Sequence, residues 1–210
     1  LWNTGSAQPS GMMELNGNAK LDARNNYAID GVLRSREFSL RVGTVQLSKI
    51  DLSSPFHADP SLISLAGLRI DAFGGRLGAK IFVENLQRLN VEGTLRNFAL
   101  PALVSAATGR QLDYDGVVDG SFTAKGNLKA KGATGYQAVA RLHISPGTRG
   151  VPLSGQINGD YSGSTSTIRL WESSLQTPHS RIDLSGSLNR HLAVQAVSHD
   201  LNDFVPIVNF

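Results

Sequence analysis

The chain has 210 residues, of which 40% are hydrophobic and 18% charged, a composition that excludes a disordered chain. The net charge is only +3 and lysine and arginine form no run, so the sequence lacks the basic patch of a nucleic-acid-binding protein. There is no cysteine, which excludes disulfides and thiolate metal sites, and no stretch approaches the roughly 20 apolar residues of a membrane-spanning helix.

Apolar and polar residues alternate through the N-terminal half. The pattern runs through residues 13–21, 27–33, 38–47, 68–72, 77–83 and 89–95. A period of two residues is typical of a strand with one buried and one solvated face. A change of parity near Gly43 predicts a bulge within one strand, and Gly74-Gly75 predicts a tight turn between two strands.

The longest alternation covers residues 114–128. Apart from Val117, one parity is apolar or glycine and the other is polar, and at about 3.3 Å per residue an unbroken strand here would reach roughly 50 Å. Further strands are expected over 138–144, 151–161, 168–170, around Leu175, and over 182–188 and 192–196, with a turn at Pro146-Gly147. Turn signals recur roughly every 8 to 15 residues, which favours an antiparallel meander.

Three segments break the alternation. Asp59-Pro60 before residues 61–65 is a helix-start signal, and residues 101–107 end at Gly109, a helix-stop signal. Residues 201–208 are a third candidate. We therefore expect a mainly β protein, a long antiparallel meander with one to three short helices. Its apolar face must be hidden from water, so the sheet closes into a barrel, stacks as a sandwich or curls around its own apolar side.

A weak internal repeat accompanies these breaks. In both copies a strand runs into a segment with Phe and Pro, at an offset of 103 residues for the strand and 105 for the proline. The matching positions are Leu89, Val91, Gly93, Phe98, Pro101 and Leu192, Val194, Ala196, Phe204, Pro206.

No catalytic or metal-binding pattern stands out. The histidines have no second histidine at metal-ligand spacing, and no serine lies in a Gly-x-Ser-x-Gly turn. Asp113 and Asp115 are the best pair for a carbohydrate-active enzyme, but alternate carboxylates on one strand are typical of a solvated face. We expect no enzyme, no cofactor and no metal.

The apolar face is rich in glycine. Nine glycines fall on it: Gly17, Gly31, Gly93, Gly116, Gly120, Gly126, Gly155, Gly159 and Gly186. Glycine there either permits sharp curvature and close packing of a large neighbour, or leaves room for an apolar guest. For the second interpretation, the predicted groove lining is Leu15, Leu33, Leu40, Ile70, Val91, Leu95, Val118, Phe122, Leu128, Leu142, Leu153, Ile157, Leu184, Leu188 and Val194.

The long alternating strands, the glycine-rich apolar face, the Gly74-Gly75 turn and the strands followed by Phe and Pro resemble the AsmA-like and TamB-like proteins of Gram-negative-type cell envelopes. The stretches GLRIDAFGGRLGAKIFV (67–83) and LNVEGTLRNFALPALVSAA (89–107) carry most of the resemblance, with similar texture over 114–128 and 180–206. The resemblance implies a long β-sheet trough of the kind these proteins form, anchored in the inner membrane and reaching through the periplasm. Their apolar groove is thought to carry phospholipid toward the outer membrane or to support outer-membrane assembly.

The resemblance implies one elongated domain over residues 1–210, curled into a trough (β-taco-like). It also implies that this domain is a segment of a larger periplasmic bridge protein, with its inner-membrane anchor outside this chain. The implied ligand is phospholipid or another acyl-chain lipid, an outer-membrane protein is a further partner for the full-length protein, and nucleic acid is not. The alternative is a structural or interaction module, a β-sandwich or β-solenoid whose apolar face is filled by its own side chains and carries no lipid.

Overall fold

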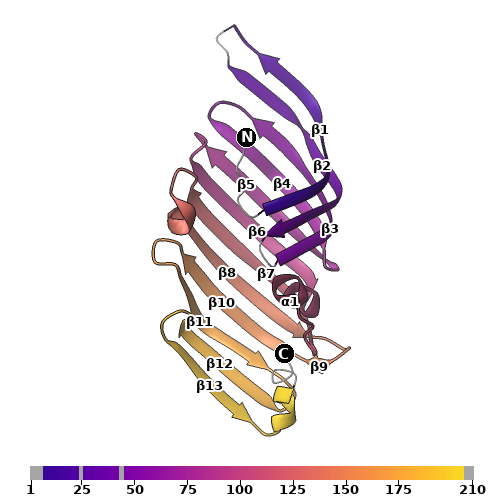
Figure 1. Ribbon diagram of the computed structural model, residues 1–210, viewed down its shortest axis with the longest axis vertical. Helices are drawn as coiled ribbons and strands as arrows, with labels where there is room; N and C mark the ends of the chain where they lie inside the picture. Colours follow the sequence, from indigo (N-terminus) through magenta and orange to yellow (C-terminus); the bar gives the residue numbers. More distant parts are fainter. Residues whose placement is uncertain (1–6, 24–25, 43–44, 206–210) are drawn as a thin grey trace.

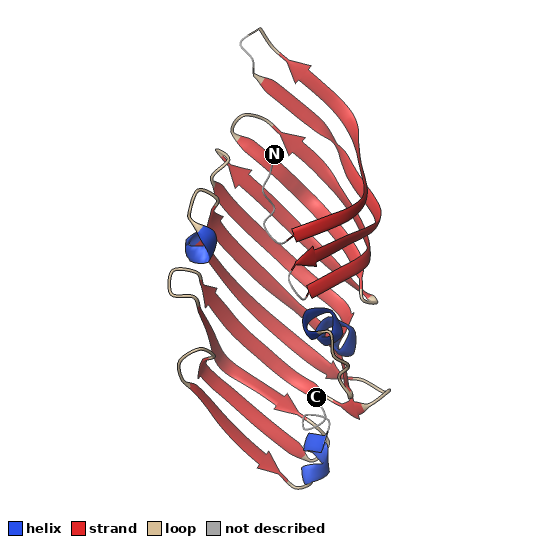
Figure 2. Ribbon diagram, viewed as in Figure 1, coloured by secondary structure: helices blue, strands red, loops and turns tan. Residues whose placement is uncertain are grey.

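The computed structural model describes residues 7–23, 26–42 and 45–205. It is a sheet of 13 strands with one α-helix and two short 3-10 helices (Figures 1 and 2). The strands are β1 (Ala7–Leu21), β2 (Tyr27–Val42), β3 (Val45–Ala58), β4 (Leu62–Ala72), β5 (Gly75–Glu84), β6 (Arg88–Ala99), β7 (Tyr114–Asn127), β8 (Tyr136–Pro146), β9 (Val151–Pro152), β10 (Ser154–Ser162), β11 (Thr167–Gln176), β12 (Ser180–Ser187) and β13 (Leu192–Ser198). The helices are α1 (Leu100–Thr108), η1 (Gly132–Gly135) and η2 (Leu201–Phe204).

The sheet is an antiparallel meander, as predicted. Each strand pairs with the next in chain order from β1 to β13, except that the two-residue β9 stands aside and pairs in parallel with β7. The described residues thus form one continuous sheet and not the two stacked sheets of a sandwich.

Strand register separates an apolar from a polar face. One row of cross-strand partners reads Leu68, Ala79, Gly93, Phe122, Ala140, Gly159 and Leu170 from β4 to β11. The next row, on the other face, reads Arg69, Gly78, Thr94, Ser121, Arg141 and Asn158. Because partners in a ladder point to the same side, the alternation in the sequence becomes two chemically distinct surfaces.

The sheet is curled around its apolar face. The helix α1 lies against β3, β6 and β7, although three strands separate β3 from β7 in the sheet. Its Leu100 and Leu103 pack on the buried cluster of Phe98, Val118 and Ile144. Figure 1 shows the ends of β1, β2 and β3 bending over the side of the sheet on which α1 lies. The apolar face is therefore concave, and the expected trough is confirmed.

Bulges with left-handed residues occur at shifts of strand register. Glu37 in β2, Asn97 in β6 and Glu172 in β11 have φ of 53°, 59° and 44°, and each lies at such a shift. Extra residues of this kind bend a strand and leave backbone groups outside the ladder. The amide of Glu37 donates to the carboxylate of Asp51 and that of Asn97 to Asp119, both over 3.0 Å.

The predicted helix over residues 61–65 is wrong, because that segment begins β4. The Asp59 carboxylate does accept bonds from the amides of Ser61 and Leu62, both over 2.7 Å, as a helix cap would. An aspartate that closes a turn makes the same local bonds, and the chain then continues as a strand paired with β3 and β5. The Ser61 hydroxyl also donates to this carboxylate, and that bond does most to lower the pKa of Asp59 to about 2. The two amide bonds act in the same direction.

Several other sequence predictions hold with small shifts, but the single strands expected over 38–47 and 151–161 are each divided between two strands. The helix α1 ends at Gly109, which has φ of 73°, and η2 occupies the start of the third predicted helix. The turn expected at Gly74-Gly75 lies one residue earlier, at Phe73-Gly74. The bulge predicted at Gly43 lies outside the described residues. Val42 and Val45 pair with each other in antiparallel strands, so the segment around them is two strands and not one.

Candidate ligand-binding face

Most of the predicted lining residues share the concave face. Ile70, Leu95, Leu142 and Ile157 belong to a single row of cross-strand partners that also contains Leu77 and Gly120. By the same register, Val91 and Phe122 lie on this face, as do the paired residues Leu15 and Leu33 at one end and Leu184 and Val194 at the other. The side chain of Leu40 lies outside the described residues.

The lining residues differ widely in exposure. Val118 is 3% exposed and belongs to the core under α1, so it offers no surface to a ligand. Leu15 and Val194 are about half exposed because they lie on the outermost strands, and Leu128 and Leu188 because they follow the ends of β7 and β12. The middle of the sheet is therefore where an apolar ligand would find side chains on several sides.

Glycines on the concave face mostly lie under large neighbours. A Cβ atom added at Gly93 would come within 2.4 Å of the Phe122 ring, and one at Gly126 within 2.5 Å of Tyr136. Ile144 covers Gly116 and Leu142 covers Gly120 in the same way. At these positions the structure supports close packing of a large neighbour and not an empty space.

One pocket on the concave face is open to an apolar guest. It has a volume of about 330 Å³, and α1 and η2 contribute Leu100 and Phe204 to its wall. The remaining lining comes from the start of β7, from β8, β10, β11 and β12 and from connecting segments: Leu112, Tyr114, Ile144, Leu153, Ile157, Leu175, Thr177, Ser180 and Ile182. Two of the predicted lining residues, Leu153 and Ile157, are among them.

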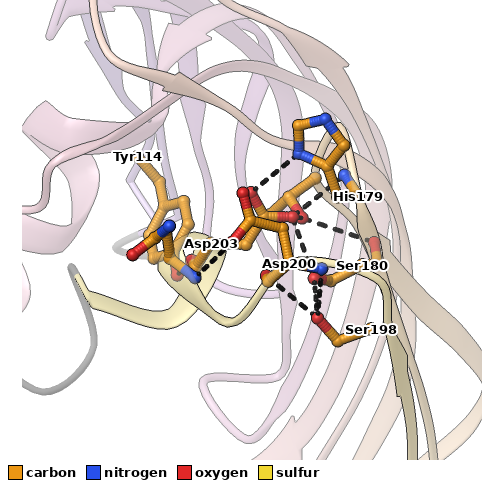
Figure 3. A network of polar contacts seen from close by, with 8 residues as sticks. Tyr114, His179, Ser180, Ser198, Asp200 and Asp203 are labelled. Atoms are coloured by element: carbon orange, nitrogen blue, oxygen red, sulfur yellow. Dashed lines mark hydrogen bonds and ion pairs between the residues drawn. The ribbon is translucent and has the colours of Figure 1, made fainter.

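Asp203 accepts hydrogen bonds from every hydroxyl group that lines this pocket. Its carboxylate accepts from the hydroxyls of Thr177 and Ser180, the latter over 2.8 Å, and its backbone carbonyl accepts from Tyr114 (Figure 3). The amide of His179 also donates to the carboxylate, over 2.9 Å. The pocket wall is thus apolar in effect, because its three hydroxyl donors are already engaged.

The same network shifts the pKa of two groups. The bond from Thr177 does most to lower the pKa of Asp203 to about 2, and the bonds from Ser180 and His179 act in the same direction against the effect of burial. Burial, and next the negative charge of Asp203, raises the pKa of Tyr114. Asp203 is therefore ionised at neutral pH and holds η2 against the starts of β7 and β12.

The cluster of Ser180, His179 and Asp203 is not a nucleophilic triad. In a triad the imidazole lies between the serine and the carboxylate, whereas here the Ser180 hydroxyl donates directly to Asp203. The His179 Nδ1 atom reaches the same carboxylate only at 3.5 Å. The serine proton has no base to receive it other than a carboxylate of lowered pKa, so the arrangement is structural.

Several carboxylates on the convex face and in the loops have structural partners. Asp115 accepts bonds from the amides of Thr148 and Arg149 and so fixes the turn after β8. His57 lies between Asp30, at 2.6 Å, and Asp59, at 3.3 Å, and the bond to Asp30 does most to raise its pKa. No metal-binding group of three or more side chains occurs among the described residues, and no described helix is long and apolar enough to span a membrane.

Comparisons with families of known proteins, with curated proteins and with solved structures found no match to this chain. The concave face and its pocket are therefore the features of the molecule that bear on its function.

Proposed function

We propose that the concave face binds the acyl chains of lipids and that the pocket under α1 and η2 is its best-defined site. The observation that carries this proposal is a pocket of about 330 Å³ whose wall is apolar except for hydroxyls that Asp203 already engages. Its volume lies at the lower end of the range typical of small-molecule sites, which suits a single hydrocarbon chain better than a bulky ring system.

The energetics of such a site favour a mobile ligand. Each methylene group removed from water contributes about 0.8 kcal/mol, and an apolar wall offers no fixed polar partner that would hold one position. From the pocket, the row of Ile157, Leu142, Leu95 and Ile70 continues across the sheet. A chain that leaves the pocket along this row meets aliphatic side chains at each strand except β7, where Leu142 covers Gly120.

On this basis, and on the resemblance to AsmA-like and TamB-like proteins, we propose a periplasmic role. The chain is then one segment of a bridge protein that is anchored in the inner membrane through another part. It carries phospholipid toward the outer membrane or supports outer-membrane assembly, with an outer-membrane protein as a partner of the full-length protein. No chemical step is involved.

A substitution that fills the pocket tests the proposal. Ile182→Trp places a larger side chain in the pocket wall without adding charge, and Val139→Trp adds the same bulk on the convex face of β8, where Val139 is 38% exposed. We expect lipid to co-purify with the parent protein and with Val139→Trp, and to be reduced at least severalfold in Ile182→Trp. Mass spectrometry of extracted lipid and binding of a fluorescent fatty acid both measure this.

Circular dichroism and thermal melts of each variant show that the fold is kept. If a folded Ile182→Trp variant bound lipid as well as the parent protein, the pocket would not be the lipid-binding site. A parent protein that binds no lipid would refute the proposal as a whole.

The second candidate is a structural or interaction module without lipid. The covered glycines favour it, because Phe122 over Gly93 and Tyr136 over Gly126 fill space that a guest would need. In this case the apolar face holds the curled sheet together and the partner is another protein. Absence of lipid from the parent protein, combined with full stability, is the result that this candidate predicts.

A further inference from the structure

Within the part of the chain that the structure describes, the outer edge of β1 has no partner strand and large apolar side chains are exposed beside it. Among the described residues, β1 pairs only with β2, so the backbone groups on its other side have no partner in the sheet. On its apolar face Met13 is 54% exposed, Leu15 45% and Leu21 73%. A long free edge with an exposed apolar face is the usual site at which another strand adds to a sheet.

The polar face of β1 indicates which strand fits there. Beyond the exposed Met12, it carries Glu14, Asn16, Asn18 and Lys20, which puts an acid on one side of Gly17 and a base on the other. If a second copy of β1 runs antiparallel with Gly17 opposite the partner's Gly17, Glu14 faces the partner's Lys20. Asn16 then faces the partner's Asn18, and two-fold symmetry repeats both pairs.

The same register matches the apolar face. Leu15 then lies opposite the partner's Ala19, and Met13 opposite the partner's Leu21. A slip of one residue on one strand would place apolar side chains opposite polar ones. Centring on Asn18 instead would set Glu14 against the partner's Asp22, and centring on Asn16 would leave both charges opposite uncharged residues.

The neighbouring strand adds to this complementarity. Arg34 in β2 is the cross-strand partner of Glu14, and Lys20 is opposite the uncharged Ala28. Across the junction the row would read Arg34, Glu14 and the partner's Lys20, with alternating charge. Opposite charges directly across two strands stabilise a sheet, and like charges there destabilise it.

We propose that two copies of this chain associate through β1, antiparallel and centred on Gly17. The sheet then continues from one copy into the other, and so does its apolar concave face. The partner is a second copy because the edge is self-complementary in charge and in its pattern of apolar residues. This inference does not depend on lipid binding.

Charge reversal tests the register. Lys20→Glu and Glu14→Lys each create two repulsive pairs across the two-fold axis, and we expect each to raise the dimer dissociation constant about tenfold. The double variant Glu14→Lys/Lys20→Glu restores opposite charges across the two-fold axis and should dimerise better than either single variant, although the new lysine then faces Arg34 of its own copy. Sedimentation equilibrium at low salt measures all four proteins, and high salt should reduce the differences between them.

A matched control and a cross-link make the test specific. Gln195→Lys adds a charge on β13, the other outer strand, and should leave the dimer unchanged.

Since the chain has no cysteine, Asn16→Cys and Asn18→Cys each introduce a single thiol. Under mild oxidation a mixture of the two variants should form disulfide-linked dimers, and each variant alone should form few.

Several results would overturn the proposal. They are a parent protein that stays monomeric at tens of micromolar, a double variant that is no better than the single ones, or cross-linking that is as efficient in Asn16→Cys alone as in the mixture.

Discussion

At the scale of single residues, glycine and the large side chain opposite it act as one unit. Gly93 and Phe122 are cross-strand partners, and the ring lies where a Cβ atom at position 93 would be. Gly126 with Tyr136 repeats the arrangement one strand further along. A ring laid over a glycine covers backbone that would otherwise face solvent and lets neighbouring strands pack closely. The glycines of the concave face therefore contribute to packing through their partners.

A double-mutant cycle measures this unit. Gly93→Ala should lower the free energy of unfolding by about 1–3 kcal/mol, because the new methyl group displaces the Phe122 ring. In a Phe122→Leu background the same substitution should cost less, with a coupling free energy of about 0.5–3 kcal/mol. Urea unfolding of the four proteins provides the values, and strict additivity would mean that the ring and the glycine do not depend on each other.

At the scale of elements, the short helices cover the apolar pocket. The helix α1 packs through Leu100 and Leu103 on the central cluster and also lies against β3, so it fills the curl of the sheet. The much shorter η2 is held by the network around Asp203 and contributes Phe204 to the pocket. The integrity of the pocket wall therefore depends on the ionisation of one carboxyl group.

The pH dependence of stability follows from the lowered pKa of Asp203. Its pKa is about 2 in the folded protein against 3.8 for the unperturbed group, so the folded state holds fewer protons between these values. The stability that the carboxylate contributes is present above about pH 4 and is lost as the pH falls through 2. Asp203→Asn should be less stable than the parent at pH 5, and the difference should narrow toward pH 2.

Denaturant unfolding from pH 5 to pH 2 measures this difference. The comparison with Asp203→Asn is needed because the pKa of Asp59 is also lowered to about 2 and affects the parent in the same direction. A difference that stays constant over this range would show that the network does not depend on the charge.

Local patterns in the sequence predicted the strands and α1 but not the contacts that define the site. Alternation reports the face of each residue directly, and Gly109 terminates α1 as its position indicates. The helix predicted after Asp59 was wrong because an aspartate that caps a helix and one that closes a turn accept the same bonds from the amides that follow. The role of Asp203 could not be predicted, since it bonds to residues 24, 26 and 89 positions away. No local pattern encodes such distances.

At the scale of the whole molecule, the sheet is nearly one-dimensional. Its strands contact mainly their neighbours in the sheet, and α1 adds a link between β3 and β7. The buried cluster of Phe98, Val118 and Ile144 lies near the middle, while large exposed apolar residues are frequent on the outermost strands β1 and β13. In such an architecture, stability is close to a sum of local terms and falls toward the ends.

Hydrogen exchange should reveal this gradient in the monomer. At low protein concentration we expect the slowest amide exchange in β6, β7 and β8, which pair beside α1, and the fastest in β1 and β13, each of which has a single neighbour among the strands that the structure describes. Raising the concentration should slow exchange in β1 but leave β13 unchanged, because only β1 gains a strand when two copies pair through it. Peptide-resolved mass spectrometry at two concentrations measures both effects. Equal protection of all strands would mean that the sheet unfolds as a single unit, and concentration-dependent protection of β13 would place the contact at the opposite edge.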